Sequence, residues 1–192
     1  GVKEVTVPVT YTDQNGETLT EPVKVKVTVL PKPTPKGIIV AKDSDKEKAK
    51  EKALAKAKEA IADGTFKGKL PENVTNVSID ENVDNPDLSD DTDVNVTVKY
   101  TVGGEEKTTV VKVPVTVVEG VPQIVPVDEN NKQPNPENSI DKTEYPDGST
   151  FEYDPKTPID TTTPGDYTVN VIVKDKDGNP IAEVPATVRV VE

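Results

Sequence analysis

The 192-residue sequence has no cysteine, histidine, methionine or tryptophan, and it has only two phenylalanines and five tyrosines. Without cysteine, disulfides, zinc–thiolate sites and iron–sulfur clusters are excluded. Without histidine, the chain lacks the side chain most often used as a general base or a transition-metal ligand. Ligand pockets are usually lined with aromatic and bulky apolar groups, which are scarce here. We therefore expect a protein that is not an enzyme and that uses no cofactor.

Basic residues are also few relative to acidic ones, so the formal net charge is −12 at pH 7. An acidic surface opposes binding to nucleic acid and to anionic membranes, which both favour basic proteins. No apolar run approaches the roughly 18 residues of a membrane-spanning helix. We expect no nucleic-acid partner and no membrane insertion.

Hydrophobic residues make up only 32% of the chain, but they are arranged in alternating runs of valine and threonine. Such a run predicts a β-strand with one buried face. The pattern of strand, glycine-containing turn and second strand with an early proline occurs over residues 5–29, 94–118 and 162–191. The sequence therefore predicts three β-hairpins of the same type.

These hairpins divide the chain into modules, which we expect to be antiparallel β-sandwiches. Because a strand pattern begins at residue 2, we interpret the first hairpin as the end of a preceding or permuted module. The short connection "EGVP" leaves little room for independent tumbling, so the last two modules should stack end to end. The predicted boundaries are 1–30 for this closing hairpin, 31–37 for a semi-rigid proline-rich linker, 38–118 for a β-sandwich with an inserted helix, 119–122 for a short linker and 123–192 for a second β-sandwich.

The two whole modules share an order of elements. Each has an opening strand (37–41 and 121–127), an alternating strand after a proline turn (70–81 and 145–155) and a polar corner (85–93 and 157–166). They differ between the first two strands, where one has a polar loop over residues 128–144. The other has a lysine- and alanine-rich segment that predicts a helix over about 44–63.

Local signals fix the ends of this predicted helix. Ser44 and Glu47 match a capping box, Asp43 and Asp45 suit the positive end of the helix dipole, and Gly64 suits the stop. One side carries a narrow apolar stripe of Ala49, Ala53, Leu54, Ala57, Ala60 and Ile61. The opposite side carries Lys46, Lys48, Lys50, Lys52, Lys56 and Lys58.

The last module resembles the Rib/alpha-like repeat of Gram-positive bacterial surface proteins over residues 121–192. The motifs that carry the resemblance are Pro136-Glu137-Asn138, Tyr145-Pro146-Asp147-Gly148, Asp160-Thr161-Thr162-Thr163-Pro164-Gly165, Asp177-Gly178 and Val184-Pro185-Ala186-Thr187-Val188. Residues 37–118 are similar to an atypical, helix-containing member, in which Ser89-Asp90-Asp91-Thr92 replaces the Pro-Gly corner. The resemblance implies immunoglobulin-like β-sandwiches in an extracellular protein attached to the cell wall through parts of the parent protein outside this sequence.

Several groups of residues are candidates for binding, and each has a simpler structural interpretation. The acidic stretch 80–93 offers carboxylates for a calcium ion between modules, but its Asp and Asn residues more often make local turn hydrogen bonds. "DKDGN" (175–179) lacks the spacing of a calcium loop and predicts a hairpin turn. The lysine side of the helix suits sulfated or sialylated glycans, although such a helix face is usually only solvated. Tyr100, Tyr145, Phe151, Tyr153 and Tyr167 are candidate sugar-stacking aromatics, but most aromatics in valine-rich sheets are core.

Two functional hypotheses remain, because nothing in the sequence singles out the paired carboxylates of a hydrolase. In the first, the modules form an extended, monomeric stalk that holds an adhesin's binding region away from the cell. In the second, the chain binds host mucin or another extracellular glycoprotein directly. The helix favours the second hypothesis, because a spacer has no evident need for this insertion.

Overall fold

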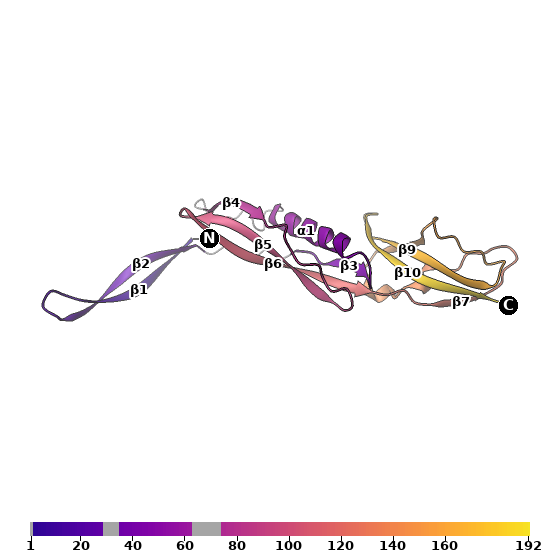
Figure 1. The fold of residues 1–192 in the computed structure, drawn as a ribbon, viewed down its shortest axis with the longest axis horizontal. Coiled ribbons are helices and arrows are strands. Elements are labelled where there is room, and N and C mark those ends of the chain that lie inside the picture. Colours follow the sequence, from indigo (N-terminus) through magenta and orange to yellow (C-terminus); the bar gives the residue numbers. More distant parts are fainter. Residues whose placement is uncertain (1, 29–34, 63–73) are drawn as a thin grey trace.

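The computed structural model describes residues 2–28, 35–62 and 74–192 (Figure 1). These residues are mainly β, with 50% of them in strands and 13% in helices. The strands are β1 (Val2–Thr12), β2 (Thr18–Thr28), β3 (Ile38–Ala41), β4 (Val74–Ile79), β5 (Thr92–Val102), β6 (Glu105–Val118), β7 (Gln123–Pro126), β8 (Thr150–Tyr153), β9 (Gly165–Lys174) and β10 (Pro180–Val191). The helices are α1 (Lys46–Ala62) and the 3-10 turns η2 (Pro136–Ser139) and η3 (Lys142–Glu144). The expected mainly β class with one inserted helix is confirmed.

Three units follow one another along the long axis (Figure 1). We name them the N-terminal ribbon (β1 and β2), the helical module (β3 to β6 with α1) and the C-terminal module (β7 to β10 with η2 and η3). The two modules have the same strand order, β3-β6-β5-β4 and β7-β10-β9-β8. In each sheet, the first strand runs parallel to the last strand of the hairpin, and the other pairs are antiparallel.

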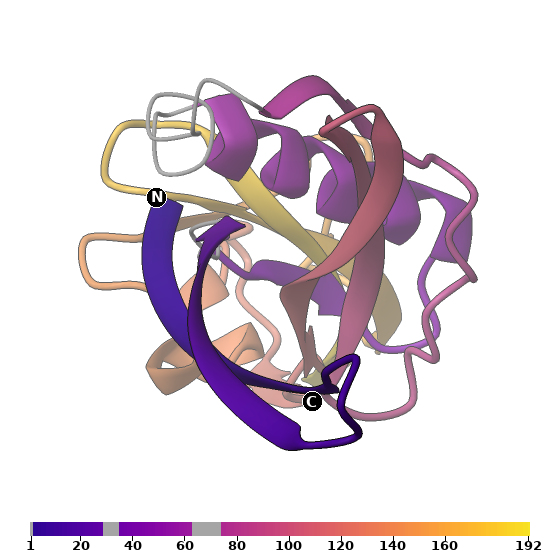
Figure 2. The ribbon, with the colours of Figure 1, turned by 90° about the vertical axis from the view of Figure 1, so that its left-hand side faces the viewer.

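The helical module buries the inward face of its long hairpin under helix α1 (Figure 2). Val96, Val98 and Val113 are fully buried, while Asn95 and Lys112 on the opposite face are exposed. The alternation along β5 and β6 therefore sorts the side chains as a strand period of two requires. The small side chains of the helix stripe allow its close approach to the sheet, and they are buried at Ala49, Ala53, Ala57 and Ala60.

The start of the helix corrects the sequence analysis. The predicted capping box at Ser44 and Glu47 is wrong, because the N-cap is Asp45. Its Oδ1 accepts hydrogen bonds from the backbone N–H of Glu47 at 3.0 Å and of Lys48 at 3.4 Å. Asp45 therefore satisfies two N–H groups that the first turn leaves without helical partners. The predicted stop at Gly64, the start of the strand expected from residue 70, and most of the proline-rich linker lie outside the described residues.

The C-terminal module has no helix over its sheet, and part of the predicted loop 128–144 is instead the two turns η2 and η3. Asn135 caps η2 by accepting from the N–H of Glu137 at 3.0 Å. The side-chain amide of Gln123, which is 9% exposed, donates to Ser139 Oγ at 2.7 Å and to the Tyr153 hydroxyl at 2.9 Å. This buried hydrogen-bond network ties β7 to η2 and β8.

The N-terminal ribbon is a two-stranded sheet that pairs with no other strand among the described residues. Its polar face includes the pairs Thr6–Lys24 and Thr10–Thr20. Its other face is apolar but uncovered, with exposed fractions between 38% and 43% at Val5, Val7, Val9, Tyr11, Leu19, Val23, Val25 and Val27. An isolated two-stranded hairpin is marginally stable at best in water. The apolar face of the ribbon has the composition of a strand face that packs in a core, but no core covers it among the described residues.

Candidate functional site at the module junction

The helical and C-terminal modules are joined by the short segment that follows β6. Lys42 donates its backbone N–H to the carbonyl of Val118 at 2.8 Å, immediately before this segment. Val121 donates to the carbonyl of Ser139 at 2.8 Å, immediately after it. Val118 and Val121 are thus both held by hydrogen bonds, and only Glu119 and Gly120 lie between them. The chain therefore has little length over which to bend.

Side chains of the helical module enter the core of the C-terminal module. Val118, the last residue of β6, is 1% exposed and packs in a cluster with Ile140, Tyr145, Val171, Val173, Ala182 and Val184. Ile39 of β3 packs against the same cluster. The neighbouring residues Ile38 and Val117 pack instead in the core of the helical module. The ends of β3 and β6 therefore form a wall with a different hydrophobic core on each side.

Gly120 lies too close to the C-terminal module for any larger residue. A Cβ atom built on it would overlap the carbonyl oxygen of Pro185 and lie 2.8 Å from the Cβ of Ala186. Glycine at this position therefore lets the linker lie directly against β10, as close backbone approach requires.

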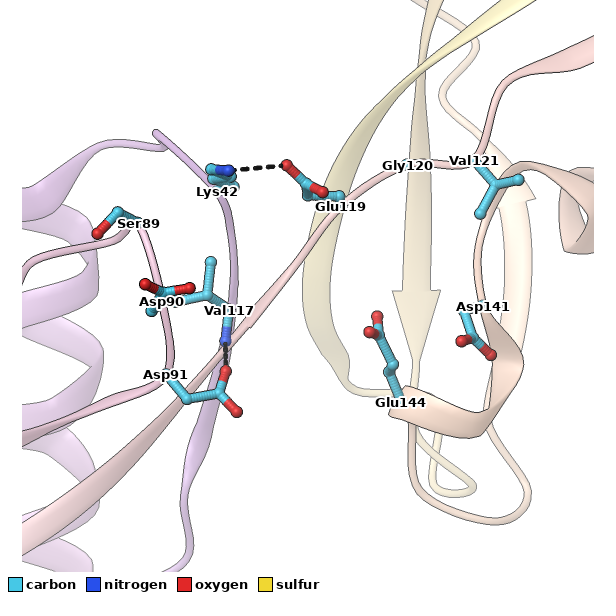
Figure 3. Close-up of a pocket in the computed structure, with 10 residues that line it drawn as sticks. All are labelled: Lys42, Ser89, Asp90, Asp91, Val117, Glu119, Gly120, Val121, Asp141 and Glu144. Carbon is cyan, nitrogen blue, oxygen red and sulfur yellow. Dashed lines mark hydrogen bonds and ion pairs between the residues drawn. The ribbon is translucent and has the colours of Figure 1, made fainter.

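An acidic cleft with a volume of about 620 Å³ lies beside the junction (Figure 3). Its lining residues are Lys42, Ser89, Asp90, Asp91, Val117, Glu119, Gly120, Val121, Asp141 and Glu144. Lys42 forms an ion pair with Glu119 at 3.2 Å across the start of the junction. Asp91 Oδ1 accepts from the N–H of Val117 at 2.8 Å, which holds the corner before β5 against the end of β6. One ammonium group thus faces five carboxylates from both modules.

The charges in this cleft perturb one another. Burial raises the pKa of Glu144, and the carboxylates of Asp141, Asp91 and Glu119 raise it further. The hydrogen bond and the charge of Glu119 raise the pKa of Lys42. Proton uptake by Glu144 therefore relieves repulsion across the junction, while Lys42 stays charged.

The acidic stretch 80–93 is not brought together as one ion-binding cluster. Asp80 and Asp87 accept local turn hydrogen bonds from the N–H groups of Asn82 at 3.0 Å and Ser89 at 3.1 Å. Glu81 forms an ion pair with Lys58 at 2.6 Å. Across the described ranges, no group of three or more acidic side chains is arranged to hold a metal ion. In the 175–179 stretch, Asp175 accepts from Asp177 and Asn179 within the hairpin turn that the sequence predicted.

A second groove, of about 740 Å³, lies between α1 and the turns of the C-terminal module, and of the six lysines predicted on one side of the helix, Lys52 and Lys56 line it. Its lining is balanced in charge and partly apolar, with the lysines Lys36, Lys52, Lys56 and Lys176, the carboxylates Glu59, Asp147, Asp175 and Asp177, and apolar residues that include Ile38, Ile39 and Ile181. Lys56 already pairs with Glu59 at 3.3 Å. Burial lowers the pKa of Lys52, partly offset by the charge of Glu183.

The candidate aromatic residues are mostly structural. Tyr145 is 7% exposed and packs edge-on against Phe151, with ring centroids 5.5 Å apart. Burial raises the pKa of Tyr145 to about 12. The Tyr167 hydroxyl donates to the Thr163 carbonyl at 2.9 Å. Tyr145 and Phe151 therefore belong to the packed interior of the C-terminal module, whereas Tyr11 of the N-terminal ribbon is 40% exposed.

Sequence reasoning missed the residues that form the junction wall and one core residue. Leu88 stands in the predicted polar corner 85–93, yet it is 1% exposed and belongs to the core of the helical module. The sequence signal for this wall is a pair of adjacent apolar residues at a place where a strand with one buried face would have one apolar and one polar residue. Such pairs occur at Ile38-Ile39 and at Val117-Val118.

Comparisons with known proteins identify one part of the chain. Residues 118–192 match the family model of the Rib domain, which confirms the resemblance and its position. The C-terminal module is therefore similar to a Rib domain, and Rib domains belong to surface proteins. No curated protein matches the chain.

A solved structure of an endo-fucoidan hydrolase from glycoside hydrolase family 107 is similar at 13% sequence identity, with a TM-score of 0.22. The match covers 98% of this chain and 34% of that one. At this score the likeness carries no argument about the chain. Among the described residues, no helix is long and apolar enough to cross a membrane.

Proposed function

We propose that this chain is a stalk segment of a bacterial surface adhesin, and that it holds a binding region at a distance from the cell wall. The observation that carries the proposal is the junction, where Val118 lies in the core of the following module and Gly120 lies against β10. A strand that is packed on both sides resists bending. The proposed role is mechanical and involves no catalysis or cofactor.

The composition suits this role. The net charge of −12 favours solubility and keeps copies apart. The N-terminal ribbon has the same hairpin pattern as the two modules, so we propose that it closes a further module, with its apolar face turned inward. The wall attachment belongs to other parts of the parent protein in this proposal, and the segment itself is monomeric.

A distance measurement across the junction tests the stalk. Because the chain has no native cysteine, Glu106→Cys and Asp177→Cys direct spin labels to one exposed position in each module. We expect double electron–electron resonance to give one narrow distribution of distances between the two spin labels. A control variant with Gly-Ser-Gly inserted between Glu119 and Gly120 should broaden it. A broad distribution in the uninterrupted chain, equal to that of the control, would contradict the proposal.

A second candidate function is direct binding of an acidic glycoprotein such as mucin. The observation behind it is the groove of about 740 Å³, where four lysines lie beside an apolar lining, although the four carboxylates of Glu59, Asp147, Asp175 and Asp177 line the same groove and oppose an anionic ligand. Lysines attract sulfate and sialate groups as point charges. Removing the whole helix would also remove core alanines such as Ala53, so neutralising the lysines is the sharper test.

This candidate is tested on immobilised mucin over a range of salt concentrations. The variant carries Lys36→Gln, Lys52→Gln and Lys176→Gln. The control carries Lys3→Gln, Lys24→Gln and Lys26→Gln on the ribbon, and so loses the same formal charge. Binding that is saturable, falls with salt and is lost only in the first variant supports a site in the groove. Equal binding by both variants excludes it.

A further inference from the structure

The groove of about 740 Å³ between α1 and the turns of the C-terminal module has two walls of opposite charge. The first wall comes from α1 and the residues before β3, and its charged residues are Lys36, Lys52, Lys56 and Glu59. The second wall comes from turns of the C-terminal module, and its charged residues are Asp147, Asp175, Lys176 and Asp177. Three lysines and one glutamate give the first wall a formal charge of +2, and three aspartates and one lysine give the second wall −2.

These opposite charges are not used up by pairing with each other. Across the described part of the chain, no ion pair joins the two walls. Lys56 pairs with Glu59 of its own wall at 3.3 Å, and the Glu59 side chain is 66% exposed. Exposed ion pairs of this kind are weak. Lys56 is therefore able to exchange this partner for a carboxylate of a ligand.

Apolar side chains line the same groove. Ile39 and Ile181 are half-buried there, and both pack against the core of the C-terminal module. Burial lowers the pKa of Lys52, which shows that its ammonium group is partly removed from water. Attraction between charges is stronger in such a place than in bulk water. A carboxylate beside Lys52 is therefore bound more firmly than one on an open surface.

The balance of charge determines which ligand fits. An anionic polymer is repelled by the three aspartates of the second wall and by the net charge of −12. A cationic polymer is repelled by the three lysines of the first wall. A ligand that is negative along one side and positive along the other is attracted by both walls. An extended peptide has this property when acidic and basic residues alternate, because successive side chains point to opposite sides.

The spacing of the lysines on α1 also matches an extended peptide. Lys52 and Lys56 are four residues apart in the helix, which separates them by about 6 Å along its axis. In an extended chain, side chains on the same side repeat about every 6.6 Å. Two successive acidic side chains on one side of the peptide therefore face the two lysines together.

We propose that this groove binds an extended protein segment in which acidic and basic residues alternate, with the acidic side toward Lys52 and Lys56 and the basic side toward Asp147 and Asp177. The two walls belong to different modules, so the bound segment bridges the junction. This interaction goes beyond the proposed stalk. It shares its groove with the second candidate function, but the ligand is a protein segment of zero net charge instead of an acidic glycan.

Two peptides of the same composition test the proposal on the unmodified 192-residue chain. The probe is acetyl-Glu-Lys-Glu-Lys-Glu-Lys-amide, and the control is acetyl-Glu-Glu-Glu-Lys-Lys-Lys-amide. In NMR titrations of the isotopically labelled chain at low salt, we expect the probe to give saturable shifts at the amides of Lys52, Lys56 and Asp177. We expect the control to bind about threefold more weakly or less, because only part of its charges face a wall of opposite sign. Added salt should weaken both.

Two double variants then locate the site. Lys52→Glu with Lys56→Glu reverses the charge of the helix wall and should weaken binding of the probe by about tenfold or more. Lys46→Glu with Lys50→Glu is the matched control, because it makes the same change at the same spacing on α1 but outside the groove lining. Glutamate is a good helix former, so both variants should fold. The control variant should bind the probe as the unmodified chain does.

Equal binding of the two peptides by the unmodified chain would overturn the proposal. Equal binding of the probe by the two double variants would overturn it as well. If sialyllactose shifts the same amides and the probe does not, the groove binds an acidic glycan and the second candidate function replaces this one. The stalk is judged separately, by the distances between modules measured without any peptide.

Discussion

Replacing Val118 with alanine tests whether the two modules share structure at their junction. The side chain belongs to β6 of the helical module, yet it is 1% exposed within the core of the C-terminal module. The substitution removes two methyl groups, each worth about 0.8 kcal/mol when buried. The cavity that remains adds a further cost. We therefore expect the free energy of unfolding to fall by about 2 kcal/mol.

Calorimetry distinguishes the two ways in which this loss can appear. A loss of 1 kcal/mol lowers the melting temperature by about 2–4 °C in a unit of 150–250 residues and by about 4–8 °C in one of 60–100 residues. We expect a fall of about 4–8 °C with a single transition, because the wall makes the two modules one cooperative unit. Val110→Ala is the control, since Val110 lies in the same strand and is 54% exposed. If both variants melt at the same temperature, Val118 does not occupy the neighbouring core and the reasoning is wrong.

Three further predictions concern the linker, the cleft and the ribbon. Gly120→Ala should lower the free energy of unfolding by about 1–3 kcal/mol, because the Cβ of alanine would overlap the Pro185 carbonyl. Urea unfolding measures this loss, and an unchanged midpoint concentration of urea would contradict the prediction. Burial and nearby carboxylates raise the folded-state pKa of Glu144 above 4.5, so its ionisation costs stability as pH rises through that pKa. Glu144→Gln should therefore stabilise the chain by about 0.5 kcal/mol at neutral pH and have no effect well below pH 4.5, as thermal melts across this range would show. Val7→Lys should lower the melting temperature no more than Thr6→Lys on the opposite face, because Val7 is 40% exposed. A much larger fall in melting temperature for Val7→Lys would mean that the apolar face of the ribbon is covered.

The hairpins could be predicted from the sequence because their signals are local. Alternation along Val169, Val171 and Val173 fixes which side chains face inward. Gly178 adopts a φ of +83°, which is readily accessible to glycine, so the turn is also encoded where it occurs. The family resemblance was recognised from the same local motifs, and the matched residues 118–192 contain all of them.

Other features were not accessible from local patterns. Ser44 and Asp45 are both good N-cap residues, and only the path of the chain after β3 decides that Asp45 is used. Leu88 is one apolar residue among polar ones, so no period identifies it as core. The partial burial of Lys52 depends on packing near the C-terminal module, as the field of Glu183 indicates. Such contacts between distant segments have no signature within a short window of sequence.

The two apolar pairs carry more information than their length suggests. A strand with one buried face alternates, whereas a strand buried on both faces has apolar residues at successive positions. Ile38-Ile39 opens the short apolar strand β3, and Val117-Val118 ends β6. Another adjacent pair in β6, Val110-Val111, lies in mid-strand and leaves Val110 54% exposed, so the position of a pair at the strand end matters. The members of the first two pairs divide between the two cores, with Ile38 and Val117 on one side and Ile39 and Val118 on the other. An apolar pair at the end of a closing strand therefore indicates a packed junction, whereas a closing strand that alternates to its last residue favours a free linker.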